Sequence, residues 1–176
     1  MGPFRADLPI AALVVIGLAY AILAAGSVAL AVIDARTHRL PNRWVLPGYP
    51  ILIVLLTVAC LCGAPWSSLL RAVVAGAVLF AFYLLLRMLG PGGMGGGDVK
   101  LAGVLGIALG WVGWGALAVG AFAGFVLGGI YGVMLIALRR ASAKTAVPFG
   151  PWMLAGAWVG ILFGEDLGHR LLALPV

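Results

Sequence analysis

Two aspartates carry the chemistry that this sequence could perform. Asp34 ends the first long apolar run, and Asp98 follows a glycine-rich stretch that extends from Gly90 to Gly97. Two carboxylates held near one water molecule resist double ionisation, so one keeps a proton while the other stays charged. The charged carboxylate can take a proton from water, and the protonated one can donate to the carbonyl of a peptide bond. The pair therefore predicts peptide hydrolysis without a metal or a covalent intermediate.

Each aspartate taken alone also has a structural explanation. Asp34 could be a boundary charge that stops a membrane helix, because a carboxylate at mid-bilayer costs about 2.5–3.5 kcal/mol on insertion scales. Asp98 could cap free N–H groups of a new helix, which we expect to begin at Asp98 because Pro91 ends the preceding helix. The glycines before it allow another part of the chain to approach closely. The catalytic interpretation depends on the two carboxylates meeting.

Few other residues compete for a catalytic role. His38 and His169 are the only histidines, and we expect them on opposite sides of the membrane, which argues against a histidine metal cluster or a Ser-His-Asp triad. The glycine-rich stretch lacks G-K-[ST] and follows an apolar helix, so it is neither a P-loop nor a Rossmann turn. Cys60 and Cys62 form a C-x-C pair, which predicts neither a zinc site nor a disulfide. We expect no metal and no cofactor.

The composition predicts that the lipid bilayer is the solvent of this protein. Of its 176 residues 64% are hydrophobic and 9% charged, whereas a soluble domain carries roughly 25% charged residues. The uncharged run from Leu8 to Ile33 exceeds the apolar part of a signal peptide, which is about 7–15 residues long. The net charge of +6 could suggest nucleic acid. The basic residues stand singly or in pairs between apolar runs, however, as membrane-orienting charges do.

Charges and glycine-proline clusters divide the chain into six expected membrane helices, which form one all-α domain over residues 1–176. The expected helices cover residues 8–33, 44–62, 67–88, 98–112, 115–138 and 147–164. Ser67 is the expected N-cap of the third helix, and we expect Arg71 to extend towards the membrane interface. Glycines recur every four residues at 120–132 and at 156–168. This spacing predicts close helix packing and not chemistry.

The basic residues indicate how the chain is oriented. If the N-terminus lies outside, eight basic residues fall on the cytoplasmic side and three outside. The cytoplasmic set is Arg36, Arg39, Arg43, Arg87, Lys100, Arg139, Arg140 and Lys144, and the outer set is Arg5, Arg71 and Arg170. This follows the positive-inside rule and predicts that both termini are extracytoplasmic. It also places Asp34 and Asp98 at the same, cytoplasmic face of the membrane.

Three segments resemble motifs of the type IV prepilin peptidases, a family of membrane aspartyl proteases. They are residues 34–47, with Asp34, Leu40-Pro41-Asn42 and Pro47; residues 93–102, with Gly-x-Gly-Asp at 95–98; and residues 147–151, Val-Pro-Phe-Gly-Pro. Gly-x-Gly-Asp alone is a weak signal. The three motifs in order, at the cytoplasmic ends of expected helices, are a strong one. The resemblance covers nearly the whole chain.

The resemblance implies an aspartic endopeptidase in the cytoplasmic membrane of a prokaryote, which removes the leader from prepilins or pseudopilins after a glycine. It implies that Asp34 and Asp98 are the catalytic pair. The supporting residues would be Gly95, Gly97, Lys100, Pro41 and Asn42, and the substrate-facing loop would contain Pro148, Phe149, Gly150 and Pro151. The implied surroundings are membrane lipid and no nucleic acid, and the oligomeric state stays open.

The sequence also departs from the longer members of this family. Many of them carry an N-terminal domain with paired C-x-x-C motifs that methylates the new N-terminus. Here about seven residues precede the first apolar run, and no C-x-x-C occurs. We therefore expect the short form, as found with Flp/Tad-type pili, without methyltransferase activity. Two alternatives stay open: a small proton-coupled transporter, because intramembrane acids also mark proton relays, and a non-enzymatic pilus-assembly scaffold.

Overall fold

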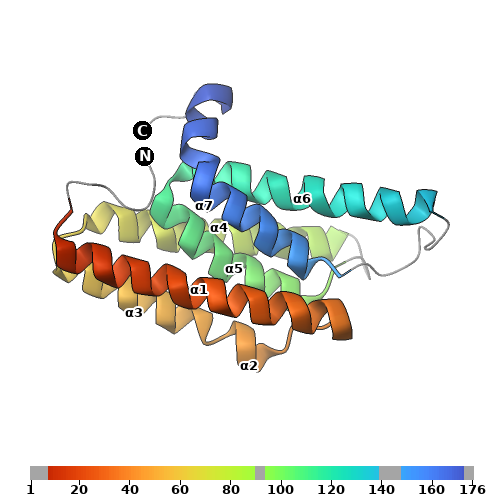
Figure 1. The fold of residues 1–176 in the computed structure, drawn as a ribbon, viewed down its shortest axis with the longest axis horizontal. Coiled ribbons are helices and arrows are strands. Elements are labelled where there is room, and N and C mark those ends of the chain that lie inside the picture. The colour runs from red at the N-terminus through yellow and green to blue at the C-terminus, as the bar shows by residue number, and fades with distance from the viewer. Residues whose placement is uncertain (1–7, 90–93, 139–147, 173–176) are drawn as a thin grey trace.

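The structure, a computed structural model, is an elongated bundle of α-helices that describes residues 8–89, 94–138 and 148–172 (Figure 1). The helices of these residues are α1 (Ile10–Thr37), α2 (Asn42–Val45), α3 (Gly48–Leu61), α4 (Trp66–Leu89), α5 (Gly96–Val112), α6 (Trp114–Ala137) and α7 (Gly150–Leu172). No strand occurs in the described ranges. The all-α class predicted from the sequence is therefore confirmed.

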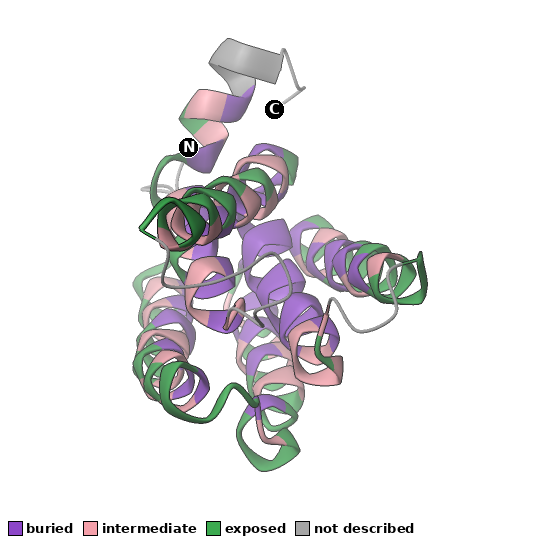
Figure 2. Cartoon of the chain, turned by 90° about the vertical axis from the view of Figure 1, so that its right-hand side faces the viewer, coloured by how far each residue is buried: buried purple, intermediate pink, exposed green. Residues whose placement is uncertain are grey.

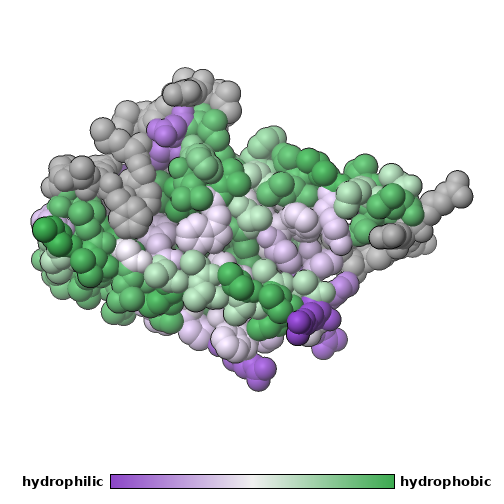
Figure 3. All heavy atoms as spheres, in the orientation of Figure 1, coloured by the Kyte–Doolittle hydropathy of each residue, from purple (hydrophilic) through white to green (hydrophobic). Residues whose placement is uncertain are grey.

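Four stretches of the described chain are long and apolar enough to cross a membrane. They are α1, the stretch Asn42–Leu61 that joins α2 and α3, α4 and α6. Figure 3 shows hydrophobic residues over much of one face, with hydrophilic residues gathered where α1 ends and α2 lies. The polytopic membrane class is confirmed, but the count of six spans and the position of both termini stay predictions. Arg5 and the basic residues at 139–144 lie outside the described residues.

Helix α5 lies at the centre of the bundle, where the other helices cover it (Figure 2). Every residue from Leu101 to Val112 is buried. A Cβ atom added at Gly106 would lie 2.7 Å from the carbonyl oxygen of Ala75, and one at Gly110 would lie 3.0 Å from the Cα of Ala72. Glycine is needed here because a larger residue would push α5 away from α4. The surrounding helices thus fix α5, which carries Asp98 in its first turn.

The glycines at four-residue spacing form the contact between α6 and α7. A Cβ added at Gly160 would lie 2.7 Å from the Cα of Gly120, and one at Gly156 would lie 2.5 Å from the Cα of Gly124. The predicted packing role is confirmed for these residues. Gly132 has no neighbouring atom within 4 Å of an added Cβ, so it lies outside this contact.

The helix boundaries differ from the expected ones near both aspartates. Helix α1 continues to Thr37, so Asp34 lies in its last turn and not at its end. Helix α5 begins at Gly96, two residues before the expected start, with Gly95 as its N-cap. Asp98 is consequently the third residue of the helix, and its carboxylate accepts a hydrogen bond from the N–H of Gly95. The expected helix over 44–62 is interrupted between α2 and α3, at Pro47.

Arg71 binds the end of the central helix, and its expected position at the membrane interface stays a prediction. Its guanidinium donates hydrogen bonds to the carbonyl oxygens of Gly110 (2.7 Å) and Trp111 (2.8 Å), at the end of α5. The last carbonyls of a helix lack partners within the helix, and a cation near them is favourable. Arg71 therefore stabilises the end of α5 that is farthest from Asp98.

Candidate active site

One end of the bundle gathers segments that are far apart in the sequence. The end of α1, the start of α5 and the start of α7 lie right of centre in Figure 1, and the short helix α2 lies below them. A cleft of about 410 Å³ opens there. Its lining is Asp34, His38, Arg39, Leu40, Pro41, Asn42, Gly95, Gly96, Gly97 and Asp98. The two aspartates thus line one cleft, although α2, α3 and α4 separate them along the chain.

Asp34 is held by the first residue of α7. Its side chain is 4% exposed, and its Oδ2 atom accepts a hydrogen bond of 3.0 Å from the N–H of Gly150. The N-terminus of a helix favours a negative charge. A Cβ atom added at Gly150 would lie 2.6 Å from Oδ2 of Asp34, so a residue larger than glycine would disturb this contact. The chain places Gly150 against Asp34, a contact that the sequence did not predict.

His38 turns the chain across the cleft directly after α1. Its φ angle of 51° makes it the only non-glycine residue in the described ranges with positive φ. Its N–H donates a hydrogen bond of 2.8 Å to the carbonyl oxygen of Asp34. This left-handed ending of a helix reverses the chain direction sharply. The residues after it, Leu40 to Asn42, can therefore line the cleft.

Asp98 lies in the first turn of α5, outside the four stretches that qualify as membrane spans. Its Oδ2 atom accepts the N–H of Gly95 at 3.0 Å. Burial raises the pKa of the Asp98 carboxyl from 3.8 to about 6; the Gly95 hydrogen bond opposes this shift, and the charge of Asp34 adds to it. The two carboxylates therefore influence each other across the cleft. Asp98 keeps its proton to a higher pH than an ordinary carboxyl does.

Gly97 lets the start of α5 approach the segment after α1. A Cβ atom added at Gly97 would lie 2.6 Å from the Cβ of Leu40 and 3.0 Å from its carbonyl oxygen. Leu40 is buried beneath this contact. The glycine therefore permits the backbone approach that brings the Asp98 turn next to the end of α1.

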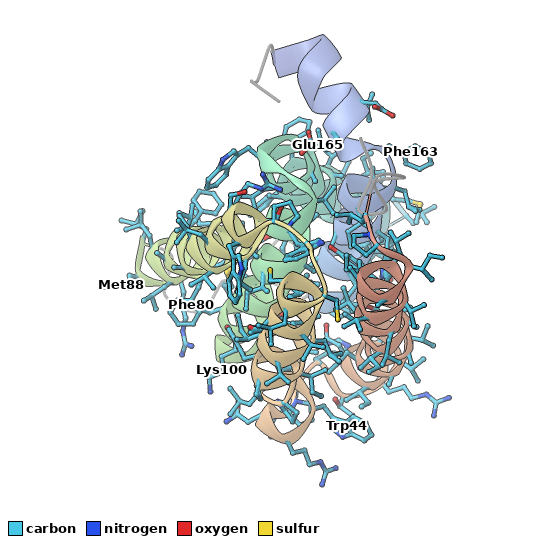
Figure 4. The ribbon with its side chains drawn as sticks, turned by 90° about the vertical axis from the view of Figure 1, so that its left-hand side faces the viewer. Trp44, Phe80, Met88, Lys100, Phe163 and Glu165 are labelled. Carbon is cyan, nitrogen blue, oxygen red and sulfur yellow. The ribbon has the colours of Figure 1, made fainter. Side chains whose placement is uncertain are left out.

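Lys100 connects α5 to α2. Its Nζ donates a hydrogen bond of 2.8 Å to Oδ1 of Asn42, the first residue of α2. The hydroxyl of Tyr49, in α3, donates to the carbonyl oxygen of Lys100 at 2.7 Å, and Figure 4 shows Lys100 beside α3. Pro41 is the N-cap of α2. The supporting residues predicted from the sequence thus lie around the cleft, and Lys100 positions its wall.

Phe149 belongs to an aromatic cluster that sequence reasoning missed. Its ring centroid lies 5.4 Å from that of Phe125 in α6, and Tyr83 of α4 lies 5.4 Å from Phe125. These residues are far apart in the sequence, so only their aromatic type could have suggested the cluster. Pro148 and Pro151 flank this position and do not line the cleft. Val147, which begins the third motif, lies outside the described residues.

A resident metal has no ready-made ligand set in the part of the chain that the structure describes. No three His, Cys, Asp or Glu side chains gather there in a way that could hold an ion. The cleft contains a pair of carboxylates, and each of them accepts a hydrogen bond from one backbone N–H.

Comparison with known proteins assigns the region that contains both aspartates to a known family. Residues 21–133, which contain both aspartates, match the model of the type IV leader peptidase family. Curated relatives named "Prepilin leader peptidase/N-methyltransferase" come from Pseudomonas putida (33% identical over 93% of this chain and 54% of the relative), Pseudomonas aeruginosa (33%, 84% and 50%) and Bacillus subtilis (28%, 78% and 52%). The chain spans about half the length of these relatives. No solved structure matches it significantly.

Proposed function

Because this chain belongs to the type IV leader peptidase family, we propose that it is a membrane aspartic endopeptidase that removes the leader of type IV prepilin-like proteins. The substrate class follows the name of the curated relatives. The catalytic residues are Asp34 and Asp98. The observation that carries this proposal is that both aspartates line one cleft.

The surroundings of the two carboxylates support different roles in the reaction. The Gly150 N–H at the start of α7 donates a hydrogen bond to Asp34, and the raised pKa of Asp98 favours the protonated form of Asp98. Asp34 takes a proton from water as the water oxygen bonds to the peptide carbonyl carbon, and Asp98 gives its proton to the carbonyl oxygen. The resulting diol loses a proton back to Asp98, the C–N bond breaks, and Asp34 passes its proton to the leaving amine.

Cleavage at the cytoplasmic face of a prokaryotic cell membrane is supported by charge. Arg36, Arg39 and Arg43 are exposed at the end of the bundle that holds the cleft, as the positive-inside rule requires of a cytoplasmic face. The product would enter pilus or secretion-system assembly. The proposal covers the peptidase reaction alone, because the sequence lacks the C-x-x-C motifs that the resemblance associates with methylation.

The test is cleavage of a co-expressed prepilin by Asp34→Asn and Asp98→Asn variants. Each change keeps the shape of the side chain but removes its proton transfer, so we expect a rate loss of about 10²–10⁴-fold. Asp166→Asn, in α7, is the matched control and should cleave normally. Normal cleavage by either cleft variant would contradict the proposal. Proton uptake into proteoliposomes without cleavage would favour the transporter instead.

A further inference from the structure

A second hollow, of about 500 Å³, lies between α1 and α3 and shares no lining residue with the catalytic cleft. Apolar side chains such as Ile22 and Leu30 of α1 and Ile51 and Leu52 of α3 form most of its wall. Ile22 and Ile51 are exposed, so the hollow is a groove that is open at the molecular surface. In a bilayer this groove would face lipid.

The groove has open space along α1 at Gly26. Gly26 of α1 lines it, and a Cβ atom added there would have no neighbour within 4 Å, which leaves a notch in the helix surface. Helices α1 and α3 already contact each other beside the groove. A further helix, about 10–12 Å across, could not enter between them. From Ile22 to Leu30 the groove follows α1 for about 12 Å, at 1.5 Å per residue.

The end of the groove towards α2 has a different chemistry. Arg43 and Trp44 line it there, and Trp44 is 51% exposed. Figure 4 shows Trp44 on the side of the molecule where α3 faces α1. Tryptophan concentrates at the level of lipid headgroups, and an arginine guanidinium binds phosphate through two parallel hydrogen bonds. The groove thus combines an apolar length with a cationic end, as a phospholipid combines an acyl chain with a phosphate.

Ser27 is a polar side chain within the apolar part of the groove. The Ser27 hydroxyl lines it, but this hydroxyl donates to the carbonyl oxygen of Leu23 and accepts the indole N–H of Trp158. Its one hydrogen atom is therefore already donated within the protein. A ligand in the groove would meet apolar surface along its length and charge only at Arg43.

We propose that the groove between α1 and α3 binds one acyl chain of an anionic phospholipid, whose headgroup phosphate contacts Arg43. The site is independent of the catalytic cleft and of the proposed peptidase reaction. Arg36 and Arg39 are exposed at the same end of the bundle but do not line the groove, so Arg43 is the residue that we assign to the headgroup.

Native mass spectrometry of the purified chain in detergent tests this proposal, with phosphatidylglycerol and phosphatidylcholine as probes. We expect the chain to retain phosphatidylglycerol preferentially, and Arg43→Gln to weaken its binding about fivefold, which corresponds to about 1 kcal/mol for one arginine at an anionic surface. Gly26→Leu fills the notch and should reduce retention of both lipids. The matched controls are Arg36→Gln, outside the groove, and Gly132→Leu, on an equally open surface of α6.

Several results would overturn the proposal. Unchanged lipid retention by Gly26→Leu would show that the lipid binds elsewhere. If the chain retained both lipids equally and Arg43→Gln changed neither, the headgroup would have no role in binding. Displacement of the lipid by millimolar inorganic phosphate would indicate an anion site without an acyl chain. Displacement by an apolar helical peptide would indicate a helix-docking surface.

Discussion

At the scale of single residues, the two aspartates of the cleft differ in their burial and in their hydrogen-bond donors. Asp34 is buried in α1 and depends on a backbone N–H from α7, whereas Asp98 is partly buried and takes its N–H from its own helix. A buried carboxyl costs free energy when it ionises without enough compensation. The geometry of the proposed catalytic pair therefore has consequences for stability, and these can be measured separately from cleavage.

Asp98→Asn should stabilise the protein at alkaline pH. Because its pKa is raised from 3.8 to about 6, the folded state binds this proton more tightly than the unfolded state. The contribution of Asp98 to stability is complete below pH 4 and is lost as the pH rises through about 6. Asparagine does not titrate but can still accept the Gly95 N–H. We expect a gain on the order of 1–3 kcal/mol at pH 8, which disappears near pH 4.

Thermal unfolding in detergent at pH 4 and pH 8 measures this difference. Asp166→Asn, away from the cleft, should show no comparable dependence on pH. A variant at position 98 that is equally or less stable than the original chain at pH 8 would refute the electrostatic explanation.

Gly150→Ala should impair catalysis while the bundle stays folded. The added Cβ would lie 2.6 Å from the Asp34 carboxylate and would shift that carboxylate by a fraction of an ångström or more. Misplacement of a catalytic group by about 1 Å can cost about 100-fold in rate, so we expect a fall of about 10–100-fold in kcat. Gly129→Ala in α6, where an added Cβ has open space, is the control. Equal activity of the two variants would show that the Gly150 contact is unimportant.

Sequence reasoning could identify the residues of this site more easily than their contacts. Asp34 and Asp98 stand out because five acids occur in a strongly apolar chain. The Gly150 contact joins residues 116 positions apart and depends on where α7 packs. A residue type cannot indicate such a partner. The motif around Gly150 suggested a substrate-facing loop, and its position beside Asp34 became visible only in three dimensions.

At the scale of helices, α5 is held at both ends by groups from outside its own sequence. The Leu40 segment packs on its first turn, and Arg71 of α4 binds its last carbonyls. The lengths of the apolar runs were enough to predict most helices. They could not locate the break at Pro47 or the start at Gly96, because caps and turns are fixed by neighbouring helices as well as by local preference.

Arg71→Met should destabilise the bundle through α5. The change keeps most of the apolar stem but leaves the carbonyls of Gly110 and Trp111 without their charged donor. A hydrogen bond to a charged group contributes about 1.5–3 kcal/mol, so we expect a loss of that order in thermal unfolding. Arg36→Met, on an exposed surface, should cause little change. Equal melting temperatures for the two variants would contradict the capping role.

At the scale of the whole molecule, glycine contacts decide how closely the helices assemble. Gly156→Leu would force a side chain into the backbone of Gly124, where α6 and α7 meet. Overpacking costs about 1–3 kcal/mol, and displaced α7 would also withdraw Gly150 from Asp34. We expect both a lower melting temperature and slower cleavage. Gly132→Leu makes the same change on an open surface and should alter neither; a similar loss in both variants would point to residue size alone.

The contact between Asp34 and the start of α7 also has a consequence for biosynthesis. Ribosomes deliver the helices in order, so α1 with Asp34 enters the membrane long before Gly150 is made. Until then the carboxylate lacks its N–H donor, and one side of α5 lacks the cover that α7 supplies. If the proposed function holds, the nascent chain would therefore cut neighbouring proteins poorly until α7 has been made and packed against α1.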